Sequence, residues 1–140
     1  MTCEAVENFT EAQWRKLIWN VPFNGLCITE GGIDTGALLE KEGGEERVRE
    51  LMKEVQATAG ALGYEIEDSF LEFQISRTYP MKDYRPSSMI DFVNGLLVEV
   101  EAIWGEPLRR AKAAGVLVPR LEALEAEIRK MVSERDAVSL

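Results

Sequence analysis

The stretch WRKLIWNVPFNGL (residues 14–26) decides the fold of this chain. Its polar residues Lys16, Asn20 and Asn24 recur every four positions. Each step of four along an α-helix turns only roughly 40° beyond a full circle. On a helix these three side chains therefore form one polar stripe inside an otherwise apolar surface, and such a stripe faces either water or a cleft.

Signals on both sides of this stretch define the helix that carries it. Thr10 followed three residues later by Gln13 is a capping box, which predicts a helix start. Pro22 lacks a backbone donor, so we expect a kink that frees carbonyl groups near Ile18, beside the polar stripe. The glycine pair at residues 31–32 ends the helix.

Helical periodicity continues through the rest of the chain, and no segment alternates convincingly as a strand. Further helices are expected at residues 35–39 (capped by Asp34), 48–62, 68–78, 87–93 (capped by Ser87 or Ser88), 98–114 and 119–131, with a loop at 79–86. Gly105 and Pro107 are weak points within the helix at 98–114. The sequence therefore predicts one all-α domain of about seven helices over residues 1–140.

Composition excludes several classes of function. The net charge of −9, from 25 acidic and 16 basic residues, argues against non-specific binding to nucleic acid or to an anionic membrane. The chain has no histidine, which excludes histidine-based acid–base chemistry and His-ligated zinc. Two cysteines, Cys3 and Cys27, without a disulfide framework favour a reducing compartment, and no segment is apolar enough to span a membrane. A cytoplasmic protein is expected.

The remaining polar motifs are weak by themselves. No G-x-G-x-x-G loop follows a strand, so no nucleotide site is visible. Glu42, Glu45 and Glu46 precede or open a helix, where acidic residues favour the helix dipole, and we expect no metal site there. Lys16 alone reads most simply as a surface ammonium whose stem packs on a tryptophan. Asn20 and Asn24 are poor helix formers without a cap role, and they favour a cleft instead.

Taken together, four motifs resemble the C-terminal domain of the ketopantoate reductases (2-dehydropantoate 2-reductases). They are WRKL with Asn20 and Asn24 (residues 14–24), RPSSM with Asp91 (85–91), EVEAIWG (99–105) and AGV with Pro119 (114–119). The resemblance extends from about residue 9 to about residue 131. It implies an all-helical domain of the ketopantoate reductase and 6-phosphogluconate dehydrogenase type. In that family an N-terminal Rossmann domain binds NADPH, and a 2-keto acid is reduced between the two domains.

The resemblance also implies roles for individual residues. Lys16 matches the catalytic lysine that supports the ketone oxygen and supplies the proton. Asn20 and Asn24 match two substrate-side asparagines, and Glu99 matches the acid that holds the product hydroxyl. For the RPSSM helix, Ser88 matches a carboxylate-binding serine and Asp91 a neighbouring aspartate. The segment before Glu99 departs from the family: it is one residue shorter and lacks the usual Gly-Arg-Pro.

Partners and rival functions follow from this resemblance. We expect a 2-keto acid substrate such as ketopantoate and NADPH bound mainly by a Rossmann domain in cis or in trans, but neither nucleic acid nor a membrane as a partner. A homodimer is one assembly that the resemblance allows. Lys16, Asn20 and Asn24 are predicted to line one concave surface with Glu99. The alternative is a non-catalytic interaction or dimerisation module, which has no use for Lys16 or Glu99. In either case an apolar surface patch is expected where a Rossmann domain is missing.

Overall fold

The computed structural model describes residues 10–139 and contains seven α-helices, two short helical turns and no strand within that range. In chain order these are α2 (Glu11–Thr29), α3 (Thr35–Glu40), α4 (Gly44–Ala61), α5 (Asp68–Thr78), the 3-10 turn η1 (Tyr79–Met81), α6 (Ser87–Val93), the π-helical turn η2 (Glu101–Gly105), α7 (Glu106–Ala113) and α8 (Pro119–Ser139). The prediction of an all-α fold is confirmed. None of the helices in this range combines the length and hydropathy that a membrane span requires.

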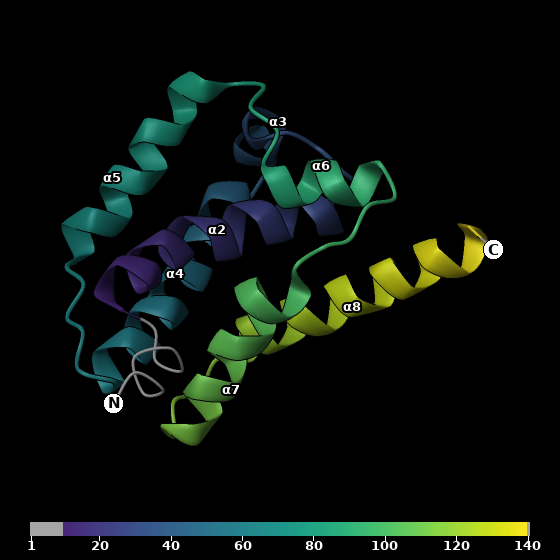
Figure 1. The fold of residues 1–140 in the computed structure, drawn as a ribbon. Coiled ribbons are helices and arrows are strands. Elements are labelled where there is room, and N and C mark those ends of the chain that lie inside the picture. The colour runs from purple at the N-terminus through teal and green to yellow at the C-terminus, as the bar shows by residue number, and fades with distance from the viewer. Residues whose placement is uncertain (1–9, 140) are drawn as a thin grey trace.

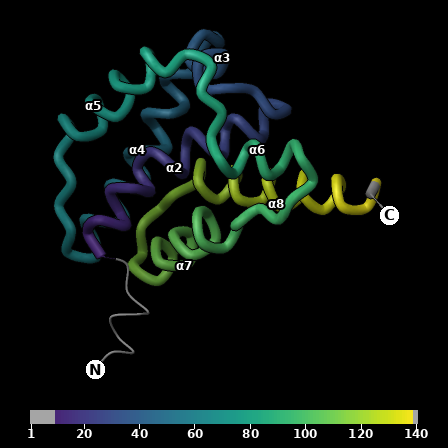
Figure 2. The backbone as a smooth tube through the Cα atoms, turned by 45° about the horizontal axis from the view of Figure 1, so that its top comes forward, coloured from purple at the N-terminus to yellow at the C-terminus, as the bar shows by residue number. Residues whose placement is uncertain are grey.

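Helix α2 is the central element of the domain. It contacts α4, α6, α8 and η2, and Figures 1 and 2 place α5 on one side of it and the α7–α8 pair on the other. The capping box is present: the Gln13 N–H donates to Thr10 Oγ1 (3.2 Å) and the Thr10 N–H to Gln13 Oε1 (2.7 Å). The helix continues through Pro22 to Thr29. Trp14 and Ile18 are fully buried. Burial of a large apolar side chain contributes about 1.5–3 kcal/mol to stability. Packing therefore stabilises α2 more than helix propensity does.

Gly25 lets α8 approach the middle of α2. A Cβ atom at this position would lie 2.6 Å from Leu124 Cδ2 and 2.9 Å from Trp104 Nε1, closer than packed atoms allow. The Trp104 indole N–H donates to the Val21 carbonyl at 3.0 Å. These contacts join α2 to α8 and, through η2, to the segment predicted as a helix over residues 98–114.

The segment predicted as one helix over residues 98–114 is continuously helical over residues 100–113, but its first part has π-helical geometry. It forms the π-helical turn η2 followed by α7. Pro107 cannot donate a hydrogen bond to the carbonyl of Ile103, so the regular i to i−4 ladder is interrupted at that point. The change from π-helical to α-helical geometry falls beside Gly105 and Pro107, the two positions that the sequence marks as weak.

Side chains from distant parts of the chain cap the N-termini of two helices. The prediction that Ser87 or Ser88 caps α6 is wrong, because Pro86 occupies the cap position without a side-chain hydrogen bond. Instead Asn24 Oδ1 of α2 accepts the Ser88 N–H at 2.9 Å. In the same way Glu54 of α4 accepts the N–H of Leu121 (2.8 Å) at the start of α8. The two tertiary caps satisfy helix N–H groups that the local sequence leaves unpaired.

Other boundaries differ from expectation in small ways. The predicted loop at 79–86 begins with η1, after which the backbone of Lys82 and Tyr84 accepts hydrogen bonds from the first residues of α3. Helix α8 continues past residue 131 to Ser139. There the Arg135 guanidinium donates to the Phe92 carbonyl at the end of α6 (3.0 Å), which ties the C-terminal turns of α8 to the domain.

Cys27 lies in the core, and acidic residues occupy the first turn of α4. Cys27 is fully buried in the core, and burial, with a contribution from Asp34, raises the pKa of its thiol to about 12. Cys3 lies outside the described residues. Glu45 and Glu46 occupy the first turn of α4 and pair with Arg49. Within residues 10–139 no group of His, Cys, Asp or Glu side chains is arranged to hold a metal ion.

Candidate functional site

An open groove of about 580 Å³ lies between the first half of α2, helix α5 and the segment that follows α5. Lys16 and Asn20 line it side by side, one helical turn apart, as the polar stripe predicts. The residues that line the groove are Ala12, Arg15, Lys16, Trp19, Asn20, Phe70, Gln74, Arg77, Met81 and Tyr84.

Positive charge is concentrated in this groove although the chain is acidic overall. Arg15, Lys16 and Arg77 line it, and no carboxylate does among the described residues. Arg15 is already paired with Glu11 (2.9 Å) and Glu67 (3.1 Å), and the hydrogen bond to Glu11 raises the pKa of its guanidinium. Lys16 and Arg77 form no ion pair with any residue in the described range. The groove therefore offers an anionic ligand two cations that have no ion-pair partner within residues 10–139.

A short relay of hydrogen bonds fixes the orientation of Asn20. The Ser88 N–H can only donate, so the atom of Asn24 that faces it at 2.9 Å is the oxygen Oδ1. Asn24 Nδ2 then donates to Asn20 Oδ1 at 3.3 Å. Because that oxygen is occupied, Asn20 presents its amide N–H groups as the free hydrogen-bonding edge. Asn20 is half-buried at the groove, which makes it a donor for a carbonyl or carboxylate oxygen.

The predicted residues beneath the groove are buried. Asn24 is 2% exposed and Ser88 is 6% exposed, and neither lines the groove. Asn24 connects α2 to α6 through the relay, which gives it a structural role that the sequence does not reveal. The structure therefore brings Lys16, Asn20, Asn24 and Ser88 together, with the first two at the surface and the other two behind them.

Asp91 and Glu99 lie outside the lining of the groove. Asp91 is half-buried on α6, and its backbone carbonyl accepts the Leu96 N–H at 2.8 Å. Glu99 is exposed in the connection that precedes η2. Glu99 does not line the groove that Lys16 lines, so the predicted concave surface shared by Lys16 and Glu99 stays a prediction.

Side chains from α5 and the following loop form the opposite wall of the groove. The Trp19 indole N–H donates to Thr78 Oγ1 at 2.8 Å, and the Tyr84 ring lies edge-on to Trp19 with ring centroids 6.0 Å apart. Arg77 Nε donates to Gln74 Oε1 at 2.7 Å, and the Arg77 guanidinium lies 5.9 Å from the centre of the Trp19 ring. Sequence reasoning missed Gln74, Arg77 and Tyr84 as site residues, because periodicity shows that α5 is amphipathic but not which helix it faces.

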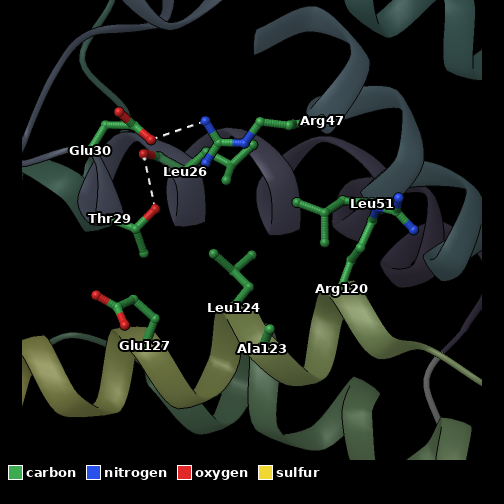
Figure 3. A pocket seen from close by; sticks show the side chains of 9 residues that line it. All are labelled: Leu26, Thr29, Glu30, Arg47, Leu51, Arg120, Ala123, Leu124 and Glu127. Atoms are coloured by element: carbon green, nitrogen blue, oxygen red, sulfur yellow. Dashed lines mark hydrogen bonds and ion pairs between the residues drawn. The ribbon is translucent and has the colours of Figure 1, made fainter. Parts of the chain in front are cut away.

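A second groove, of about 380 Å³, lies between α2, α4 and α8 (Figure 3). Its floor is apolar, with Leu26, Leu51 and Leu124, and its charged rim is largely paired within the protein. Arg47 binds Glu30 at 3.0 Å, and Arg120 binds Glu50 at 3.0 Å. It contains none of the residues predicted for the site. The groove beside Lys16 is therefore the stronger candidate for chemistry.

Comparison with known proteins identifies the family. The family described as "Ketopantoate reductase PanE/ApbA C terminal" matches residues 8–132. A 2-dehydropantoate 2-reductase from Nostoc sp. is 36% identical over 129 residues, which are 92% of this chain and 40% of that protein.

Solved structures agree with this assignment. The 2-dehydropantoate 2-reductase from Methylococcus capsulatus is 34% identical with a TM-score of 0.85, and the match covers 91% of this chain and 44% of that one. The enzyme from Geobacter metallireducens is also 34% identical, with a TM-score of 0.80, over 84% of this chain and 39% of that one. This chain thus spans less than half the length of these relatives. With its described helices arranged as in these proteins, the chain belongs to the ketopantoate reductase family and corresponds to the C-terminal domain of that family.

Proposed function

We propose that this domain supplies the substrate-binding and proton-donating residues of an NADPH-dependent reductase. The reductase converts ketopantoate or a related 2-keto acid to the 2-hydroxy acid. The observation that carries the proposal is the groove in which Lys16 and Asn20 lie side by side, with positive charge that no carboxylate among the described residues neutralises. A 2-keto acid is an anion with two adjacent groups of acceptor oxygens, and these residues offer a cation and an oriented amide donor. In the case of ketopantoate, the product belongs to the pantothenate pathway.

In this proposal Lys16 acts on the keto oxygen. Hydride addition to the keto carbon is the chemistry that a nicotinamide cofactor supplies, and it leaves negative charge on that oxygen. The Lys16 ammonium stabilises this charge and transfers a proton from Nζ to the oxygen, which completes the hydroxyl group. Asn20 donates from Nδ2 to a substrate oxygen, and the relay through Asn24 holds that amide in the required orientation.

The other predicted residues do not line the groove, and each has a proposed role in the complete site. Glu99 holds the product hydroxyl, and Ser88 and Asp91 belong to the helix that lies behind Asn24, at the carboxylate side of the substrate. In this arrangement Asn24 positions Asn20 and does not itself contact the substrate, because it is 2% exposed.

The cofactor is proposed to bind mainly to another domain. Residues 10–139 form no strand, so they contain no strand-to-helix turn of the kind that cradles a dinucleotide pyrophosphate. The open side of the groove and its aromatic residues Trp19 and Tyr84 fit a site that a second domain completes. We propose a Rossmann domain in cis or in trans for that role, and assembly as a homodimer stays a prediction.

The test is turnover of the complete reductase, that is, this domain with its nucleotide-binding domain. The substrates are ketopantoate and other 2-keto acids, each with NADPH or NADH. Lys16→Ala is expected to lower kcat by about 10²–10⁴-fold while the fold stays intact. Lys16→Arg keeps the positive charge, but a guanidinium stays protonated at every working pH, so this variant is expected to remain strongly impaired as a proton donor.

Lys53→Ala is the matched control, because Lys53 is an exposed lysine of α4 outside the groove. Near-normal turnover of folded Lys16→Ala would refute the catalytic role. The absence of reduction by the wild-type enzyme with every 2-keto acid would favour a non-catalytic module instead.

A further inference from the structure

We infer that Arg77 binds the carboxylate of the 2-keto acid and so determines that the substrate is an acid. The inference rests on the proposed function, because it assigns one end of the substrate to a residue opposite Lys16 in the same groove. No ion pair within residues 10–139 neutralises Arg77. Its positive charge is therefore available to a ligand that enters the groove.

Contacts on two sides hold the Arg77 side chain in place. Its Nε donates to Gln74 Oε1 at 2.7 Å, and Gln74 is only 6% exposed. Its guanidinium lies over the ring of Trp19 at 5.9 Å, and that indole is itself tethered to Thr78. These contacts occupy Nε and one face of the guanidinium. The two terminal Nη groups remain, and they match the two oxygens of a carboxylate in a bidentate pair.

The other groups that the proposal places near the substrate carboxylate supply no free positive charge, whether or not they assist in holding it. Arg15 is paired with Glu11 and Glu67. Ser88 is 6% exposed, and its N–H is bonded to Asn24. In this arrangement Lys16 contacts the keto oxygen, Asn20 is the oriented amide donor and Arg77 binds the carboxylate.

Direct binding to this chain is the first test, and the readout is the ¹H–¹⁵N NMR spectrum. The probes are 3-methyl-2-oxobutanoate, the uncharged 3-methyl-2-oxobutanamide and inorganic phosphate. The acid is expected to shift the Arg77 Nε–H and Trp19 indole signals saturably, and to do so at least tenfold more tightly than either of the other probes. Equal binding of the amide or of phosphate would overturn the assignment.

Variants separate Arg77 from its neighbours in this titration. Arg77→Gln is expected to weaken binding of the acid by at least tenfold, and Arg77→Lys to weaken it less, because a point charge cannot form the bidentate pair. Lys16→Ala is expected to retain the shift at Arg77. Arg85→Gln is the matched control, since Arg85 is an exposed arginine of the adjacent loop that does not line the groove. Unchanged binding in Arg77→Gln would overturn the inference.

Steady-state kinetics of the complete reductase give the second test. Arg77→Gln is expected to raise KM for the 2-keto acid by about 10–100-fold and to change kcat by less than about threefold, because ground-state and transition-state carboxylates are alike. A fall in kcat with an unchanged KM would overturn the carboxylate role. If the wild type reduces no 2-keto acid but Arg77-dependent binding of the acid persists, the reductase proposal fails and the Arg77 site stands.

Discussion

The hydrogen bond from the Ser88 N–H to Asn24 should contribute measurably to the stability of the domain. Asn24→Leu keeps the number and branching of the side-chain heavy atoms but removes the acceptor, so the Ser88 N–H stays buried without a partner. Leaving one buried donor unsatisfied costs ~1–3 kcal/mol. The longer bond from Asn24 to Asn20 (3.3 Å) is lost as well. We expect the free energy of unfolding to fall by about 2 kcal/mol.

Two measurements on this chain test that expectation. In thermal unfolding followed by helical circular dichroism, about 2 kcal/mol corresponds to a fall in Tm of roughly 6–10 °C for a domain of this size. In hydrogen exchange, the Ser88 amide should lose its protection in Asn24→Leu while amides of the middle of α4 keep theirs.

Asn94→Leu provides the matched control, because it is the same substitution at an asparagine that is exposed at the end of α6. It should change the free energy of unfolding by less than ~0.5 kcal/mol. If Asn24→Leu proves as stable as Asn94→Leu, Asn24 does not cap α6 in solution, and the argument for the orientation of Asn20 is refuted.

Two further predictions concern the core. Gly25→Ala should destabilise the domain by ~1–3 kcal/mol in denaturant unfolding, because its Cβ would lie 2.6 Å from Leu124 Cδ2. Gly60→Ala has open space around its Cβ and should stabilise the domain by ~0.5–1 kcal/mol. Equal effects of the two substitutions would refute the close approach at Gly25. Cys27 should stabilise the fold fully below the unfolded thiol pKa of ~8.5 and progressively less as pH rises toward its folded pKa of about 12, by at most ~1.4 kcal/mol per pH unit. Relative to Cys27→Ala, wild-type stability should therefore fall between these two pH values, and a constant difference would contradict the burial of the thiol.

Local signals in the sequence were sufficient for most of the helices. The capping box at Thr10 and the glycine after α4 predict helix ends because the groups that satisfy the terminal N–H and C=O are near in sequence. The position of Pro107 likewise marks the place where the helix at 98–114 changes geometry. These effects depend on neighbours within one or two turns.

The parts that sequence could not predict depend on contacts between distant segments. The caps of α6 and α8 come from Asn24 and Glu54, which lie 64 and 67 residues away from their partners Ser88 and Leu121. The same holds for the site. The spacing of Lys16 and Asn20 places them on one face, but Arg77 reaches that face only because α5 packs beside α2. No periodicity within α5 contains that information.

The bond between Asn24 and the backbone of residue 88 also limits how this sequence can change over evolutionary time. The donor is a main-chain N–H, so every amino acid except proline can supply it, and residue 88 is restricted in this respect only by the space around it. The acceptor is the side chain of Asn24, and it must also donate to Asn20. Few side chains can both accept and donate there. The hydroxyl groups of serine and threonine are on shorter side chains, and glutamine is one methylene longer. Substitutions are therefore tolerated more readily at residue 88 than at residue 24.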